Sequence, residues 1–184
     1  MKRAFFIIAV IPFLFACNQQ AKEKADTTEN LIVPGKSIGT FAIGSSADSL
    51  IKVLGKPDRS DAAMGSMLNT WYAKHDTAAA RTSLFSTREM GTPDDSVSRI
   101  KKIIVTSPDF KTKEGLTVGA SLAEIGKYYG VRSTGTYKEK GKAYVSYSDL
   151  EKGIGFEVDS ETRKSVAINV FKVEDASVAY MNIH

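Results

Sequence analysis

Two segments of this chain carry the same pattern of glycine, serine and apolar residues, and this repeat limits the possible folds more than any other feature. Residues 43–55 and 118–130 align without gaps, and several aligned positions are identical. Because repeated local signals build repeated local structure, we expect two similar units, residues 31–109 and 110–184. The identical pairs are Gly44 and Gly119, Ser46 and Ser121, Lys52 and Lys127, and Gly55 and Gly130.

Each repeat segment predicts a short amphipathic helix between two turns. A serine stands where an N-cap is needed, an acidic residue follows in the first turn, and apolar residues recur at i, i+3 and i+4. The flanking glycines suit a tight turn before the helix and a left-handed position after it. Helices of about two to three turns are too short to persist without packing on something else. Two unrelated short helices between glycines would also look alike, so the repeat rests partly on the strand pattern that follows each segment.

Short segments rich in β-branched and aromatic residues follow both helices. Their connections are short and turn-like, which predicts antiparallel meanders. The sequence therefore predicts an α+β fold of two tandem units, each with one or two short helices packed on an antiparallel sheet of three or four strands. The expected strands are residues 66–73, 80–87 and 97–106 in the first unit, and 131–138, 142–148, 153–159 and 165–171 in the second.

The first repeat segment, Ile43-Gly44-x-Ser46-x-x-x-Leu50-x-x-x-Leu54-Gly55-x-Pro57, resembles the opening motif of the BamE-like and β-lactamase-inhibitor-protein-like (BLIP-like) superfamily. That resemblance implies a helical hairpin on a small antiparallel sheet, and in the inhibitor proteins two such units in tandem. The second copy departs from the motif, because Gly126 interrupts the helix and Val131-Arg132 replaces the Lys-Pro step. No binding residue of the superfamily can be matched here, and a shared fold does not choose between an assembly factor and an inhibitor.

The N-terminus predicts a secretory signal. Two positive residues, Lys2 and Arg3, precede an apolar run over residues 4–15, which is too short for a transmembrane helix of about 20 residues. Leu14-Phe15-Ala16-Cys17 resembles the lipobox of bacterial lipoprotein precursors. The resemblance implies that residues 1–16 are removed and that Cys17 becomes lipidated. An ordinary secretory signal with a chance cysteine, and an uncleaved anchor, are the alternatives.

The residues after Cys17 predict a flexible tether and a membrane-anchored protein. Cys17 is the only cysteine, so no intramolecular disulfide can form. Residues 18–30 hold no large apolar side chain and cannot offset their ordering entropy, so residues 17–30 form a lipidated tether in this interpretation. Asn18 is not the Asp that retains many such proteins in the inner membrane, which favours the outer membrane, facing the periplasm. The net charge of +4 includes Lys2 and Arg3, so the mature chain is near neutral and no nucleic-acid partner is expected.

The sequence holds no recognisable catalytic set. Its two histidines, His75 in an expected turn and His184 at the end of the chain, lie far from further metal-ligating residues. Lys74-His75-Asp76 could bind a metal transiently, but a solvated turn is the simpler interpretation. We therefore expect no cofactor, no metal site and no enzyme. The acidic residues considered as pairs, Asp58 with Asp61 and Asp94 with Asp95, lie in loop-like sequence.

Aromatic residues on the polar faces of the expected strands indicate a binding surface. Tyr144 and Phe171 alternate with apolar residues assigned to the core, and Trp71 precedes Tyr72, so one of those two faces outward. Either a partner covers these residues, or the tandem units or residues 174–184 cover them. Lysine groups such as Lys101-Lys102 are expected to be solvated.

These features together predict a non-enzymatic envelope lipoprotein that binds another protein. A structural or assembly lipoprotein of the outer membrane is the first alternative. A small envelope hydrolase is the second.

Overall fold

The computed structural model describes residues 28–181, so the signal segment, Cys17 and His184 lie outside the described residues. Strands dominate, and the helices are short. No helix among residues 28–181 is long and apolar enough to cross a membrane. The helices are η1 (Thr28–Asn30), α1 (Ala47–Leu54), η2 (Ala73–His75), α2 (Leu122–Ile125) and α3 (Ala176–Ala179). The strands are β1 (Leu31–Val33), β2 (Ser37–Ile38), β3 (Phe41–Ala42), β4 (Arg59–Ala63), β5 (Ser66–Tyr72), β6 (Arg81–Arg88), β7 (Ser98–Val105), β8 (Lys111–Thr112), β9 (Arg132–Glu139), β10 (Lys142–Asp149), β11 (Ile154–Asp159) and β12 (Ser165–Phe171).

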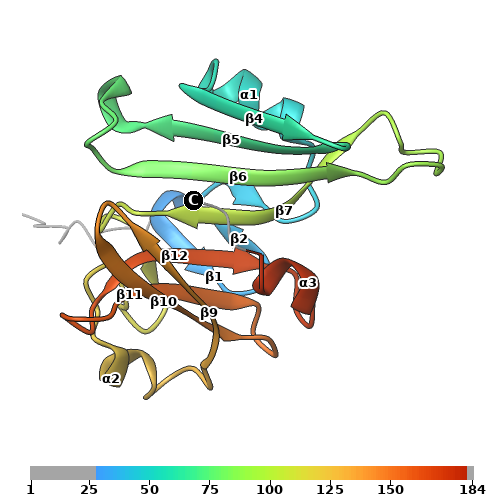
Figure 1. Ribbon diagram of the computed structural model, residues 1–184. Coiled ribbons are helices and arrows are strands. Elements are labelled where there is room, and N and C mark those ends of the chain that lie inside the picture. Colours follow the sequence, from blue (N-terminus) through green and yellow to red (C-terminus); the bar gives the residue numbers. More distant parts are fainter. Residues whose placement is uncertain (1–27, 182–184) are drawn as a thin grey trace, which may run out of the picture.

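One eight-stranded sheet runs through the whole molecule in the order β4-β5-β6-β7-β12-β11-β10-β9. Two antiparallel meanders, β4 to β7 and β9 to β12, meet where β7 pairs antiparallel with β12 (Figure 1). The register sets Ile168 opposite Val105 and Val170 opposite Ile103. A second, four-stranded sheet has the order β3-β2-β1-β8 and joins the start of the chain to the segment between the two meanders.

The predicted α+β fold of two helix-on-sheet units is wrong. The protein is mostly β, with one large sheet shared by both halves, one small sheet and three short α-helices in the described part of the chain. The seven strands expected from the sequence are present, but β7 and β12 pair with each other and merge the two expected sheets. The second helix is a single turn that ends at Ile125, before Gly126. The helices are therefore too small to form a layer of their own.

The repeat segments occupy matching positions beside the two central strands. Gly44 N–H donates to the carbonyl of Ile100 at 2.8 Å, and Ile100 N–H donates to the carbonyl of Ser45 at 3.0 Å. The second copy makes the same two bonds: Gly119 N–H to Ser165 O at 2.9 Å, and Ser165 N–H to Ala120 O at 2.8 Å. Each segment thus pairs with the strand edge at the start of β7 or β12, beyond the residues that pair these two strands with each other. It satisfies backbone groups that would otherwise form an open edge.

The repeat-motif residues meet most of their expected local roles. Gly44 and Gly119 have positive φ values of 82° and 99°, as tight turns require. Ser46 and Ser121 are N-cap residues, and Ser121 forms a capping box with Glu124. The Ser46 side chain makes no capping bond. The last glycines differ. Gly55 ends α1 with a φ of 78°, whereas Gly130 is not in the left-handed region, because α2 ends well before it.

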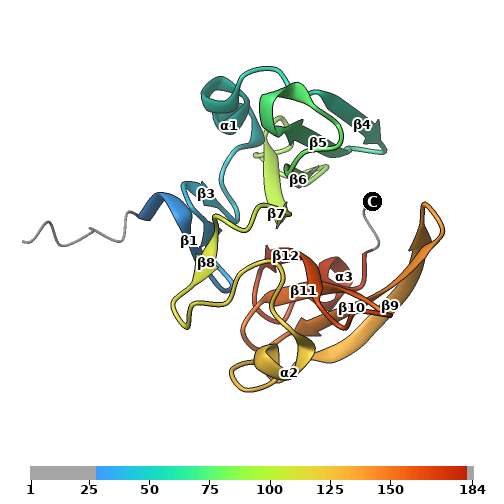
Figure 2. The ribbon, with the colours of Figure 1, turned by 90° about the vertical axis from the view of Figure 1, so that its left-hand side faces the viewer.

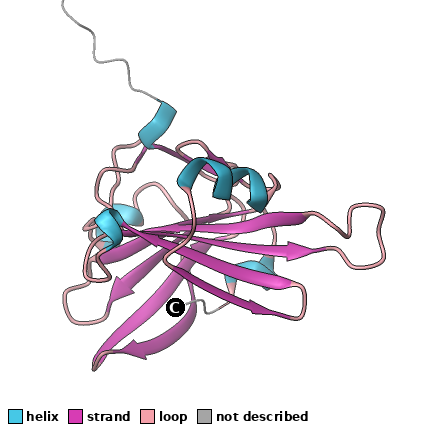
Figure 3. Cartoon of the chain, turned by 90° about the horizontal axis from the view of Figure 1, so that it is seen from above, coloured by secondary structure: helices cyan, strands magenta, loops and turns pink. Residues whose placement is uncertain are grey.

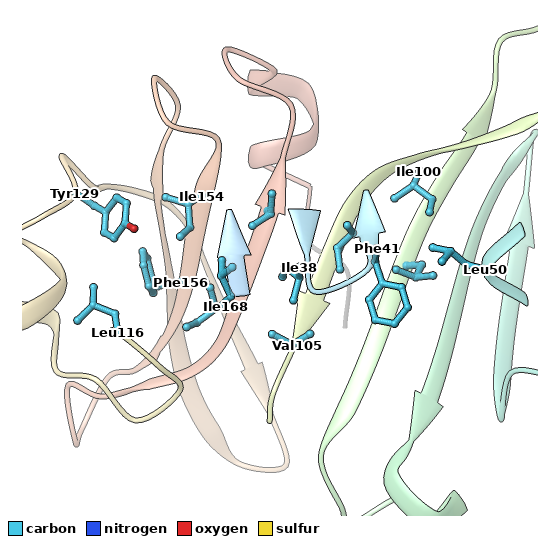
Figure 4. Close-up of a cluster of buried hydrophobic side chains, with 14 of the residues drawn as sticks. Ile38, Phe41, Leu50, Ile100, Val105, Leu116, Tyr129, Ile154, Phe156 and Ile168 are labelled. Atoms are coloured by element: carbon cyan, nitrogen blue, oxygen red, sulfur yellow. The ribbon is translucent and has the colours of Figure 1, made fainter. Parts of the chain in front are cut away.

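A continuous apolar core covers one face of the large sheet. The small sheet, α1 and α2 lie on this side (Figures 2 and 3). Figure 4 shows the core running from Leu50 and Ile100 in the first half, through Ile38 of the small sheet, to Phe156 in the second half. Trp71, the only tryptophan, belongs to the same core. Both halves therefore share one hydrophobic core.

The shared core predicts that damage in the second half destabilises the first. Phe156→Ala removes a fully buried ring of the second half and is expected to lower the free energy of unfolding by about 3–5 kcal/mol. Trp71, in the first half, reports the change. Its fluorescence transition in urea should shift to lower urea together with the transition seen by circular dichroism.

The control is Thr136→Ala, at an exposed position of β9, which should leave the urea midpoint nearly unchanged. A Trp71 transition that stayed in place in Phe156→Ala, while the circular dichroism transition split in two, would mean that the halves unfold independently.

Candidate functional site

The second face of the large sheet is concave and carries α3. Figure 2 shows the two halves of the sheet bending toward each other on the side of α3. Val178 and Ala179 of α3 pack on Phe171 and cover one end of this face. Side chains of adjacent strand positions alternate between the two faces, and the concave face carries Lys102, Ile104, Glu157, Asn169 and Phe171.

The centre of the concave face is polar but buried. Strand pairing sets Glu157 opposite Ser146 of β10. It sets Asn169 opposite Ile104 of β7, two residue pairs away from Lys102. We call Lys102, Ser146, Glu157 and Asn169 the concave-face cluster. Lys102, Glu157 and Asn169 are buried, although lysine and glutamate are almost never fully buried without a partner.

Glu157 is the acceptor at the centre of the cluster. Ser146 Oγ donates to its Oε2 at 2.6 Å, and Asn169 Nδ2 donates to its Oε1 at 3.5 Å. Burial raises the pKa of Glu157, whereas the Ser146 hydrogen bond and the charges of Lys102 and Arg81 oppose that change. Desolvation is the largest effect because no cation forms an ion pair within 4 Å of this carboxylate among the described residues.

Lys102 connects the sheet to the C-terminal segment. Its Nζ donates to the carbonyls of Val178 at 3.4 Å and Met181 at 3.3 Å. These carbonyls lie at the C-terminal end of α3, where a cation is favourable. The residue is only 3% exposed, and burial lowers the pKa of Lys102, with the Glu157 charge acting in the opposite direction. The expectation that Lys101-Lys102 is solvated is therefore wrong for Lys102, which α3 covers.

Asn169 leaves one hydrogen-bonding atom unused. Its side chain is 2% exposed, and its Oδ1 makes no hydrogen bond among residues 28–181. The amide lies over Gly155, where a Cβ atom would approach Oδ1 to 2.6 Å, so a larger residue there would displace the amide. A buried acceptor without a donor costs about 1–3 kcal/mol. A donor that reached this oxygen would recover that cost.

Tyrosines and charged residues surround the cluster. Tyr137 and Tyr144 stack with ring centroids 5.0 Å apart. Burial, followed by the charges of Glu157 and Glu139, raises the pKa of Tyr137. A cavity of about 200 Å³ joins the first half of the sheet to the tip of the β9–β10 hairpin. Its lining includes Arg59, Asp61, Tyr72, Arg81, Glu139 and Lys140.

The aromatic residues proposed from the sequence lie in three different environments. Trp71 is 8% exposed, belongs to the core, and donates its indole N–H to the carbonyl of Gly55 at 3.0 Å. Phe171 is fully buried under α3. This helix belongs to residues 174–184, which the sequence offered as one possible cover. Tyr144 is half-buried beside Tyr137. Only Tyr144 therefore offers surface to a partner in this conformation.

The sequence analysis missed Lys102, Glu157 and Asn169. Each occupies a polar position of an alternating strand, where a polar side chain is ordinary and predicts solvent exposure. Their burial depends on the curvature of the sheet and on α3, and neither is visible in the local pattern. The one available signal is Gly155 in the middle of a strand, since such a glycine often marks a close approach of another group.

The other polar candidates do not assemble a catalytic or metal site in the described part of the chain. His75 is exposed, and its Nδ1 lies 2.6 Å from Asp58 Oδ1. Asp94 pairs with Arg99, and Asp61 lines the small cavity. No three His, Cys, Asp or Glu side chains converge on a metal position among the residues described. Within the concave-face cluster, Ser146 bonds a carboxylate rather than a lysine or histidine base, which differs from an activated nucleophile.

Comparisons with known proteins reveal two similar solved structures. One is an extracellular protein containing an SCP domain from Bacillus anthracis str. Ames, at 15% identity and a TM-score of 0.46, matching 74% of this chain and 45% of that one. This chain therefore spans less than half the length of that protein. The other is a DUF4309 family protein from Bacillus subtilis subsp. subtilis str. 168, at 10% identity and a TM-score of 0.44, covering 75% of this chain and 88% of that one. No protein-family model and no curated protein matches the chain.

The raised pKa of Glu157 predicts a specific pH dependence of stability. Above its ordinary value of 4.5, the folded state binds more protons at this site than the unfolded state does. The free energy of unfolding should therefore fall as pH rises from about 4.5 through the raised pKa. Glu157→Gln removes this contribution, so urea titrations across pH 4 to 8 should show a shallower fall than in the unchanged protein.

Glu151→Gln is the matched control, because Glu151 is exposed and loses the same charge. It should keep the pH profile of the unchanged protein. Identical profiles for Glu157→Gln and the unchanged protein would contradict a desolvated carboxylate in the concave-face cluster.

Proposed function

We propose that this protein is a lipid-anchored protein of the bacterial envelope that binds a segment of a partner protein on its concave face. One observation carries the proposal: the buried polar cluster holds both an unbonded acceptor, Asn169 Oδ1, and a buried donor, Lys102. A site with both buried donors and buried acceptors suits a peptide main chain, which offers both N–H and C=O groups. A site for a simple anion or cation needs only one kind.

The contact with α3 supports the same interpretation. Lys102 already bonds two main-chain carbonyls, those of Val178 and Met181. The protein's own C-terminal segment thus occupies part of the concave face with the kind of groups that we propose for the partner. The stacked pair Tyr137 and Tyr144 lies at the side of this surface, and tyrosines are common anchors at protein interfaces.

The proposed lipid anchor rests on the sequence alone. Leu14-Phe15-Ala16-Cys17 resembles a lipobox, and residues 18–30 hold no large apolar side chain. A lipid on Cys17 would hold the folded part near a membrane surface. Asn18 favours the outer membrane, with the concave face in the periplasm.

The anchor is tested by lipid labelling in cells. The full chain should incorporate labelled palmitate and enter the detergent phase on phase separation, because two or more acyl chains give stable anchoring. Cys17→Ser should lose both the label and the detergent-phase distribution. Asn18→Gln, next to the cysteine, is the control and should keep both. Label retained by Cys17→Ser would remove the basis for anchoring at this residue.

The concave face is tested by photocrosslinking in cells. A photoreactive phenylalanine analogue replaces Tyr144 or Arg81 beside the concave-face cluster, or Val53 or Tyr128 as controls. Val53 and Tyr128 are exposed residues, on α1 and after α2. We expect one protein adduct common to positions 144 and 81, absent at 53 and 128.

The same crosslinking experiment, repeated in a protein that also carries Lys102→Met, distinguishes specific binding from non-specific crosslinking. Loss of the buried ammonium should weaken the adduct at position 144 several-fold if the cluster takes part in recognition. The circular dichroism spectrum of Lys102→Met serves as the control for folding. Adducts of equal strength at all four positions, or none at positions 144 and 81, would argue against the concave face as the binding surface.

A further inference from the structure

A further cavity lies away from the concave-face cluster, beside the start of β7. It has a volume of about 590 Å³ and is lined by the β1–β2 turn, by residues 42–44, by the β6–β7 loop, by β7 and by Lys172. Volumes of roughly 300–1,000 Å³ are typical of sites for small molecules.

The cavity exists because two chain segments share one edge of β7. β12 pairs with β7 as far as Lys102, whereas Gly44 and Ser45 pair with it at Ile100. Lys101, between these pairs, is skipped in the register with β6 and forms a bulge. The two segments therefore diverge on either side of Lys101. The turn that carries Lys36 lies next to the end of β12, since Gly153 O accepts hydrogen bonds from both Gly35 N–H and Phe171 N–H, each at 3.1 Å.

The floor of the cavity is apolar. Ile100 is fully buried at its base, Ile43 and Val97 are half-buried, and Ala42 is exposed. Gly44 adds a wall without a side chain, and a Cβ there would meet no atom within 4 Å. The floor can therefore cover an alkyl group and remove it from water.

The charged groups around the cavity are not balanced. Arg99 pairs with Asp94 at 2.6 Å, and Lys101 pairs with Glu89 at 2.9 Å. Within each of these pairs, the positive and the negative charge cancel. Lys36 and Lys172 also line the cavity, and neither side chain makes an ion pair or hydrogen bond with any residue from 28 to 181. Two lysines without an ion pair in the described part of the chain thus line a cavity with an apolar floor.

We propose that this cavity binds an amphiphilic anion, a carboxylate or phosphate on a single alkyl or acyl chain. The anionic group lies between Lys36 and Lys172, and the chain lies over Ile43, Val97 and Ile100. Neither part alone is enough. Exposed lysines hold a small free anion weakly in salt, and an uncharged chain leaves both ammonium groups unpaired. The proposal is independent of the proposed partner on the concave face.

The test uses the full chain with Cys17→Ser, so that no acyl group of its own competes. Binding of decyl phosphate, kept below the concentration at which it forms micelles, is measured by isothermal titration calorimetry. Inorganic phosphate and decanol are the two half-ligands. We expect decyl phosphate to bind at least tenfold more tightly than either. Equal affinity for decanol, or no binding of decyl phosphate, would overturn the proposal.

Variants locate the site. Lys36→Gln with Lys172→Gln should weaken decyl phosphate binding about tenfold or more. Lys127→Gln with Lys138→Gln removes the same charge from exposed positions in the second half and should change it less than twofold. Ala42→Phe adds a ring at an exposed residue of the cavity wall and should block the chain. Equal weakening by both lysine pairs would mean non-specific attraction and would overturn the proposed site.

Vesicles distinguish the source of the anion. Phosphatidylcholine vesicles with one-fifth phosphatidate are compared with pure phosphatidylcholine in a flotation assay. Flotation that requires phosphatidate and is lost with Lys36→Gln and Lys172→Gln supports a lipid in the bilayer as the natural ligand. Binding of decyl phosphate without such flotation supports a free amphiphile. Phosphatidate-dependent flotation that both lysine pairs retain, with no decyl phosphate binding, contradicts the site.

Discussion

The pairing of β7 with β12 is the interaction on which the rest of this structure depends. It places two strands that would each end a four-stranded meander side by side in the middle of one sheet. Ile103 and Val105 then face the same core as Ile168 and Val170. Where the two strands no longer overlap, the Gly-Ser segments of the repeat take over the free edges. The shared core and the curvature of the sheet follow from this arrangement.

The same pairing creates the buried polar cluster. Lys102 and Asn169 lie on the two paired strands, and Glu157 lies on the next strand, all on the concave face. Burying two ionisable groups without a close ion pair is unfavourable, because desolvation exceeds the remaining attraction. The carbonyls at the end of α3 offset part of this cost at Lys102. A protein under selection for stability alone would place apolar residues here, so the cluster supports a role in recognition.

Neighbouring residues of β7 belong to the two proposed sites. Lys101 lines the cavity proposed for an amphiphilic anion, whereas Lys102 belongs to the concave-face cluster. The bulge at Lys101 changes which way successive side chains point, and bulges commonly have this effect next to functional sites. The two proposed sites therefore share one strand. The proposed anchor at Cys17 would bring both sites close to a membrane surface.

The sequence predicted the seven longest strands because their alternation and turn residues are local signals, and β12 matches its expected range of 165–171. It also predicted the N-caps at Ser46 and Ser121, which depend on neighbours within four residues. It failed on the sheet, since no local pattern states that β7 pairs with β12. It also missed β4, whose exposed residues lack alternation.

The residues of the candidate sites also differ in whether a local sequence signal predicts them. Tyr144 was found from the sequence, as an aromatic residue on a polar strand face, whereas Lys102, Glu157 and Asn169 resemble ordinary solvated positions. The sequence by itself determined the repeat, the strands and the lipobox-like Cys17, because each depends on residues close together in the chain. Only the tertiary structure decided which polar side chains are buried and where the cavity lies. Both are consequences of long-range strand pairing and of α3 folding back onto the sheet.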